Sequence, residues 1–149
     1  MKIHLNEMSK PIKILFTALF AAYLLLLLYL TFFSKYYGRG EVQRSISIFP
    51  FRTISEFLTS GYNFRIIITN LVGNIVAFMP MGFLLPIAFS RLDKFHKVLV
   101  ISLFATLMIE VSQYISGVGA SDIDDVILNL LGAVIGYGIC MLTLKILRK

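Results

Sequence analysis

Six side chains able to carry out acid–base chemistry or to bind a polar ligand lie close together late in the chain. Two are carboxamides and four are carboxylates: Gln113 and Asn129, and Glu110, Asp122, Asp124 and Asp125. Long apolar runs flank this stretch on both sides, so its ionisable groups lie inside a membrane or at its edge. Ionisable residues at such depth are costly and rare, and they generally mark a functional site.

Polar residues at helical spacing extend this group to a second region. Residues three or four apart share one helix face, and three such pairs are present: Asn70 with Asn74, Glu110 with Gln113, and Asp125 with Asn129. Glu110 and Asn129 are equally far from the turn at 118–121, roughly 14 Å below it at ~1.5 Å per residue. Asn70 and Asn74 lie at a similar depth, so the three pairs are predicted to converge.

Three kinds of chemistry fit these residues. Glu110 with Asp122 or Asp125 could act as acid and base in bond cleavage. Several oxygen ligands could instead hold a hard cation, which would hold a phosphate. The carboxamides could also bind a sugar or peptide head group. Neither HExxH, a Ser–His pairing nor a Gly-rich phosphate loop is found, so we assign no metal site, leave the cofactor unknown and leave the three options open.

Structural explanations compete with these roles. Paired Asn and Gln residues in spanning helices often only hydrogen-bond neighbouring helices together. Asp122 is well placed to cap the helix that follows it. Gly132 and Gly136 form a small-x-x-x-small face, which allows two helices to approach closely. For Glu110 the structural explanation is weaker, because a carboxyl group at this depth needs a partner or an altered pKa.

The composition predicts an all-α membrane protein of one domain, residues 1–149. The chain is 58% hydrophobic and 15% charged, with a mean hydropathy of +0.84, and apolar runs of about 20 residues indicate spanning helices. Four are predicted, and they are 12–33, 66–89, 98–117 and 123–147. The first is too long for the core of a cleaved signal peptide. The single cysteine, Cys140, excludes an internal disulfide.

Basic residues are distributed between the apolar runs, which favours a membrane topology signal over nucleic-acid binding. Nine lie on the side of the two termini and five in the long connection 34–65. This bias predicts cytoplasmic termini and places the converging polar pairs in the outer half of the membrane. We expect a bacterial cytoplasmic membrane.

The long connection 34–65 is predicted to contain a short interfacial helix near 53–60. Thr53 and Glu56 fit a capping box at its start, and Ile54, Phe57 and Leu58 share one apolar face. Arg52 or Arg65 of this connection could turn inward and neutralise part of the acidic cluster.

Several residues between positions 45 and 138 form an ordered set of motifs. They are Phe49-Pro50-Phe51-Arg52, Asn70-x-x-Gly73-Asn74, Phe78-x-Pro80-x-Gly82, Glu110-x-x-Gln113 and Asp122-Ile-Asp-Asp125-x-x-x-Asn129-x-x-Gly132-x-x-x-Gly136. In combination they resemble the VanZ-like family. The resemblance implies a small multi-pass membrane protein, and for some members a contribution to resistance against teicoplanin-like lipoglycopeptides.

The turn before the Asp-x-x-Asp run departs from many family members, which carry an arginine there. This chain has Gly-Val-Gly-Ala-Ser at 117–121. Its Gly119-Ala120-Ser121-Asp122 segment resembles the branch that accompanies glycopeptide resistance genes. A mechanism that needs a turn arginine would have to use Arg52 instead.

Three functions follow from the residues and the resemblance. The leading one is an outer-leaflet polar pocket that binds a membrane lipid, a lipid-linked envelope precursor or a lipoglycopeptide. Its residues would be Arg52, Asn70, Asn74, Glu110, Gln113, Asp122, Asp125 and Asn129. The second is an enzyme that modifies an envelope lipid or cell-wall intermediate. The third is a packing partner or chaperone of another membrane protein, which would dock on the Gly132/Gly136 face.

Overall fold

The computed structural model describes residues 9–34, 45–59, 61 and 64–147. Its long helices are α1 (Lys10–Phe32), α3 (Phe64–Ala88), α4 (Phe95–Ser116) and α5 (Ile123–Ile146). All four are long and apolar enough to cross a membrane. Each boundary lies within three residues of its predicted position, so the four spans and the all-α fold class are confirmed.

Shorter elements connect the long helices. Helix α2 (Arg52–Thr59) is the short helix predicted near 53–60, and the turn η3 (Ser90–Leu92) joins α3 to α4. Two strands of two residues each, β1 (Ile46–Ser47) and β2 (Ser121–Asp122), form a parallel pair. This pair was not predicted, because two-residue strands carry no detectable periodicity.

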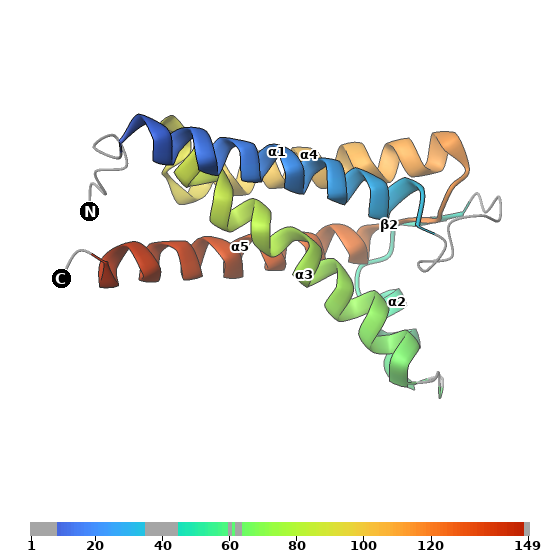
Figure 1. Ribbon diagram of the computed structural model, residues 1–149. Coiled ribbons are helices and arrows are strands. Elements are labelled where there is room, and N and C mark those ends of the chain that lie inside the picture. Colours follow the sequence, from blue (N-terminus) through green and yellow to red (C-terminus); the bar gives the residue numbers. More distant parts are fainter. Residues whose placement is uncertain (1–8, 35–44, 60, 62–63, 148–149) are drawn as a thin grey trace.

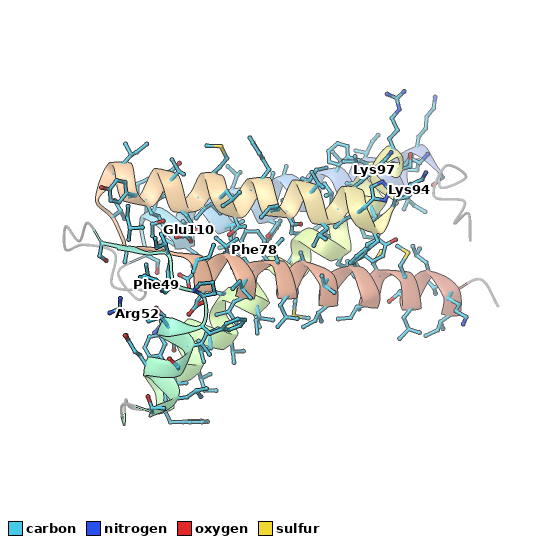
Figure 2. All side chains as sticks on the ribbon, turned by 180° about the vertical axis from the view of Figure 1, so that it is seen from behind. Phe49, Arg52, Phe78, Lys94, Lys97 and Glu110 are labelled. Carbon is cyan, nitrogen blue, oxygen red and sulfur yellow. The ribbon has the colours of Figure 1, made fainter. Side chains whose placement is uncertain are left out.

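Helix α3 crosses the other long helices diagonally (Figure 1). It contacts α1, α4 and α5, and its contact with α5 is the most extensive in the fold. The start of α1 and the end of α5 lie at one end of the bundle, and α2 and the strands lie at the other. Lys94 and Lys97 lie at the first end, far from Phe49 and Arg52 (Figure 2).

Glycines allow α3 and α5 to approach backbone to backbone. A Cβ atom at Gly136 would lie 1.9 Å from the Met79 carbonyl oxygen, and one at Gly132 would lie 2.1 Å from that of Ile75. Gly82 allows the same close approach from the α3 side, because a Cβ atom there would lie 1.9 Å from the Ala133 carbonyl oxygen of α5. The predicted close-approach face is therefore confirmed, and it is occupied within the chain. A partner protein cannot dock on it, which removes the surface that the third function required.

The apolar core lies where α1, α3 and α4 meet. It includes Phe20, Leu27, Phe78, Met81, Leu85 and Val98. The Tyr23 hydroxyl donates to the Ala77 carbonyl oxygen at 2.9 Å, which fixes α1 against α3. Large apolar side chains also point outward, such as Leu25 and Phe104, as expected of helices surrounded by lipid.

Candidate functional site

A small cavity lies among the four long helices, toward the end that holds β1 and β2. Its volume is about 40 Å³, which is room for about two or three water molecules. Ten of the described residues line it: Leu27 and Thr31 from α1, Asn74, Ala77 and Phe78 from α3, Ile109, Glu110 and Gln113 from α4, and Asp125 and Asn129 from α5. Figure 2 shows Glu110 and Phe78 between the helices.

Five of the eight predicted site residues line this cavity. They are Asn74, Glu110, Gln113, Asp125 and Asn129. Helical periodicity explains this result, because each residue faces inward on its helix at about the same depth. That these residues bind a ligand stays a prediction.

The other three predicted residues lie outside the cavity lining. Asn70 is exposed, one turn of α3 before Asn74. Asp122 is buried at the start of α5, where its side chain accepts from the Asp124 backbone N–H at 2.9 Å. The predicted helix cap at Asp122 is therefore confirmed, and its carboxylate has this structural use. Among the three carboxylates named as acid–base candidates, only Glu110 and Asp125 line the cavity.

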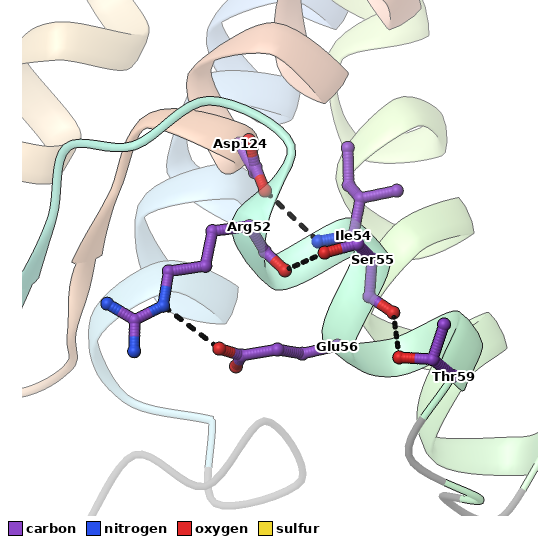
Figure 3. Close-up of polar contacts among 6 residues, drawn as sticks. All are labelled: Arg52, Ile54, Ser55, Glu56, Thr59 and Asp124. Atoms are coloured by element: carbon purple, nitrogen blue, oxygen red, sulfur yellow. Dashed lines mark hydrogen bonds and ion pairs between the residues drawn. The ribbon is translucent and has the colours of Figure 1, made fainter.

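Of the two arginines that could turn toward the acidic cluster, Arg52 does not, and the Arg65 side chain lies outside the described residues. The Arg52 Nε lies 2.9 Å from Oε1 of Glu56, in an ion pair whose two side chains are 59% and 55% exposed (Figure 3). Water solvates an exposed guanidinium, whereas turning it into the bundle would cost desolvation.

Hydrogen bonds tie the cavity residues to one another and to the backbone. Glu110 Oε2 accepts from the Asp122 backbone N–H at 2.9 Å, which joins α4 to the start of α5. Asn74 Nδ2 donates to Asp125 Oδ1 at 2.5 Å and joins α3 to α5. Gln113 Nε2 donates to the Thr31 carbonyl oxygen at 3.4 Å and joins α4 to α1. Asn74 and Gln113 therefore hydrogen-bond neighbouring helices together, as expected of carboxamides in spanning helices.

Asn129 has one amide atom that these bonds do not satisfy. Its Nδ2 donates to Thr106 Oγ1 at 2.8 Å. Its Oδ1 is buried and has no hydrogen-bond partner in the described part of the chain, and the residue is only 4% exposed. A buried acceptor without a donor is unfavourable, so this oxygen marks a place where a ligand hydrogen atom would be stabilised.

Asp124 holds the described part of the connection between α1 and α3, residues 45–59, in place, a role that the sequence did not reveal. The residue is 1% exposed, and its Oδ1 accepts from the Phe51 backbone N–H at 2.5 Å. Its Oδ2 accepts from the Ile54 backbone N–H at 3.0 Å, as Figure 3 shows. The carboxylate of α5 thus supplies the acceptor that the first turn of α2 needs. We call this pair of bonds the Asp124 clamp.

The predicted capping box at Thr53 is wrong for the same reason. Helix α2 begins at Arg52, Glu56 pairs with Arg52, and a residue 70 positions later satisfies the Ile54 N–H. A distant carboxylate with two oxygen atoms replaces the local cap, because the fold brings it to the helix start.

The turn before α2 has an unusual backbone. The Arg52 N–H donates to the Phe49 carbonyl oxygen at 3.4 Å, which closes a turn with Pro50 and Phe51 at its centre. Phe51 has φ = 64°, a value that glycine adopts readily and a phenylalanine rarely does. Such a conformation persists only when surrounding contacts enforce it, and the Asp124 clamp is one such contact.

The chain is similar to known proteins over most of its length. A family model described as VanZ/LLP1 matches residues 20–145. Protein VanZ of Enterococcus faecium is 37% identical over 137 residues, covering 85% of this chain and 76% of that protein. No solved structure matches the chain.

Proposed function

Because the chain belongs to the VanZ/LLP1 family, we propose that it is a bacterial envelope protein that binds a polar head group in the cavity between its four long helices. The head group would belong to a lipid-linked envelope precursor or to a lipoglycopeptide. Binding would lower susceptibility to teicoplanin-like drugs. The observation that carries the proposal is the convergence of five polar side chains from three helices on one cavity.

Close packing of the helices does not explain this convergence. The glycine contacts already hold α3 against α5, and they involve only backbone and small residues. Among the described residues, the polar side chains add three interhelical hydrogen bonds, yet the buried Asn129 Oδ1 has no partner there. A group that served only to hold helices together would not keep an unsatisfied acceptor beside two carboxylates.

The size of the cavity limits what can enter. About 40 Å³ admits one functional group and not a whole sugar. Thr31 and Asn74 are only partly buried, on α1 and α3. The ligand would therefore insert one terminal group and leave its larger part outside the cavity.

Acid–base catalysis has less support. Glu110 and Asp125 both line the cavity, but each accepts a structural hydrogen bond, from Asp122 and Asn74 respectively. A general acid or base must exchange its proton with a substrate within hydrogen-bond reach. An enzymatic role stays a prediction, and it would show as an altered covalent product in envelope lipid or cell-wall precursor profiles.

Removing one cavity charge at a time should raise susceptibility to teicoplanin. In Glu110→Gln and Asp125→Asn the new amide oxygen can still accept the existing hydrogen bond, so the fold should be kept. Losing one charge-assisted bond to a ligand weakens binding by about tenfold or more. We therefore expect the minimum inhibitory concentration conferred by the protein to fall toward that of cells without it.

Glu56→Gln is the matched control, because Glu56 is an exposed carboxylate at the same end of the bundle. It should leave susceptibility unchanged. Membrane abundance of every variant is measured in parallel. Unchanged susceptibility of Glu110→Gln and Asp125→Asn at normal abundance would contradict the proposed pocket.

The sidedness of the cavity is part of the proposal. The charge bias supports an extracytoplasmic location for the end with β1, β2 and α2. Phe49→Cys should then react with a membrane-impermeant maleimide in intact cells, because Phe49 is exposed at this end. Lys94→Cys, at the other end, should react only after permeabilisation. The native Cys140 is fully buried and gives the unlabelled background. The reverse pattern would contradict the topology.

A further inference from the structure

One face of α4 carries a row of buried polar residues that extends past the cavity. The row consists of Ser102, Thr106, Glu110 and Gln113, whose spacings of three or four residues place them on one side of the helix. Glu110 and Gln113 line the cavity. Thr106 lies one helical turn deeper, outside the lining residues, and is 0% exposed. A fully buried hydroxyl next to the cavity can act on it only through another residue.

That residue is Asn129, because Thr106 holds one end of its carboxamide. Thr106 Oγ1 accepts from Asn129 Nδ2 at 2.8 Å, and Asn129 is only 4% exposed. A carboxamide is planar, with donors at its nitrogen and an acceptor at its oxygen, so fixing Nδ2 also fixes the direction of Oδ1. Asn129 lines the cavity, and its Oδ1 has no partner within the described ranges. The threonine therefore keeps an acceptor oxygen turned toward the cavity.

This oxygen restricts which ligand group can enter. A buried acceptor without a donor is unfavourable. Water that fills the cavity before binding can donate to it. A ligand group that displaced this water without bringing a donor of its own would lose that hydrogen bond. The requirement follows from Asn129 and Thr106 alone, whatever the protonation states of the neighbouring carboxylates.

A buried hydroxyl on this face of α4 does not by itself indicate a role. Ser102, one turn further from the cavity, is also 0% exposed, and its Oγ has no hydrogen-bond partner in the part of the chain that the structure describes. Thr106 differs because its oxygen holds a residue of the cavity lining. Ser102 is therefore a matched control for Thr106.

We propose that Thr106 is a positioning residue, which holds the Asn129 carboxamide so that Oδ1 accepts a hydrogen bond from an N–H or O–H group of the ligand. Groups that carry acceptors only, such as ether oxygens, are selected against. The proposal rests on the cavity being a ligand site, and it identifies the chemistry of the group that enters. Two sources can supply this chemistry, an amine and a hydroxyl.

Native mass spectrometry of the purified protein with equal amounts of three phospholipids tests this requirement. The head group of phosphatidylethanolamine has N–H donors, that of phosphatidylglycerol has O–H donors, and that of phosphatidylcholine has neither. We expect at least one of the first two to be retained about fivefold or more over phosphatidylcholine, the effect of one buried acceptor left unsatisfied. Preference for phosphatidylethanolamine alone identifies an amine, preference for phosphatidylglycerol alone identifies a hydroxyl, and preference for both shows that either donor suffices.

Variants connect the preference to Thr106 and Asn129. Asn129→Leu removes the acceptor and should abolish the preference. Thr106→Val keeps the shape of the side chain but removes the oxygen that holds Nδ2, so the preference should fall by about fivefold, toward equal retention. Thr106→Ser keeps the hydroxyl and should keep the preference. Ser102→Ala should change neither the preference nor the midpoint of thermal unfolding.

A double variant separates positioning from packing. Thr106→Val added to Asn129→Leu should change the preference no further, because Thr106 acts through Asn129. If Thr106→Val lowers the unfolding midpoint but keeps the full preference, Thr106 serves packing only and the positioning role is wrong. Equal retention of the three lipids by the unmodified protein, higher retention of phosphatidylcholine, or retention of none would overturn the donor requirement. This part of the test needs no variant, so it does not depend on any substitution folding.

Failure here is distinguishable from failure of the proposed function. If Glu110→Gln raises teicoplanin susceptibility but the unmodified protein shows no preference for donors, the pocket stands and the inferred ligand chemistry is wrong. If the preference is found and is lost in Asn129→Leu, but Glu110→Gln and Asp125→Asn leave susceptibility unchanged, the site stands and the resistance role is wrong.

Discussion

Gly136→Ala should prevent α3 and α5 from packing and should remove most of the folded protein from the membrane. The added methyl group would lie 1.9 Å from the Met79 carbonyl oxygen and 2.8 Å from its carbonyl carbon. Both are backbone atoms of a helix, so no side-chain rotation relieves the clash. The helices must separate, and the contacts at Gly132 and Gly82 would open with them. Overpacking in a well-packed core costs about 1–3 kcal/mol, and here three contacts move together.

The measurement is the folded fraction after solubilisation, followed by the thermal unfolding midpoint. Gly138→Ala is the matched control, because a Cβ atom at Gly138 would meet nothing within 4 Å and lies on the same helix. Its midpoint should equal that of the unmodified protein or exceed it, since alanine favours helix over glycine. Equal midpoints for the two variants would contradict the close approach of α3 and α5.

Asp124→Ala should release residues 45–59 from the helix bundle. The substitution removes both acceptors of the Asp124 clamp and leaves the Phe51 and Ile54 N–H groups without them. Each polar group left unsatisfied in a buried place costs about 1–3 kcal/mol. Phe51 would also lose a contact that enforces its positive φ. We therefore expect the free energy of unfolding to fall by about 2–4 kcal/mol.

Amide hydrogen exchange across 45–59 provides the measurement for this clamp. Exchange in α2 should rise strongly in Asp124→Ala and much less in Asp124→Asn, which keeps one acceptor oxygen. Glu56→Ala should change little, because it removes only an exposed ion pair. Adding Phe51→Gly to Asp124→Ala should recover part of the stability, since glycine adopts the positive φ without strain. Unchanged exchange in Asp124→Ala would show that other contacts hold the loop.

The helices were predictable because their signal is long and repeated. An apolar run of 20 residues has few alternatives in a membrane, and polar residues three or four apart define a face once the helix is assigned. Asn74, Glu110, Gln113, Asp125 and Asn129 could therefore be placed together. Asn70 lies on the same stripe of α3, one turn further out, where the helix no longer faces the cavity.

The Asp124 clamp and the β1–β2 pair could not be predicted, since both depend on how the connection before α3 meets the connection before α5. Asp124 stands between two candidate residues, and the sequence gives no sign that its partners lie in another connection. Thr31 was missed because it takes part through its backbone carbonyl, which every residue has. Thr106 was missed because a threonine in an apolar helix is common. Three-dimensional proximity, and not residue type, defines these contributions.

The Asp124 clamp also determines when the protein can be completed during biosynthesis. The Phe51 N–H must wait for a carboxylate 73 residues later in the chain, which at about 5–20 residues per second is an interval of roughly 4–15 s. The Ser45 carbonyl oxygen likewise has its donor, the Ser121 N–H, only after that later residue is made. The carbonyl groups of Ile75 and Met79 can pack only after Gly132 and Gly136 are made. The first three spanning segments therefore emerge before their partners in α5, and insertion of α5 is the step at which the helix bundle, the Asp124 clamp and the cavity form together.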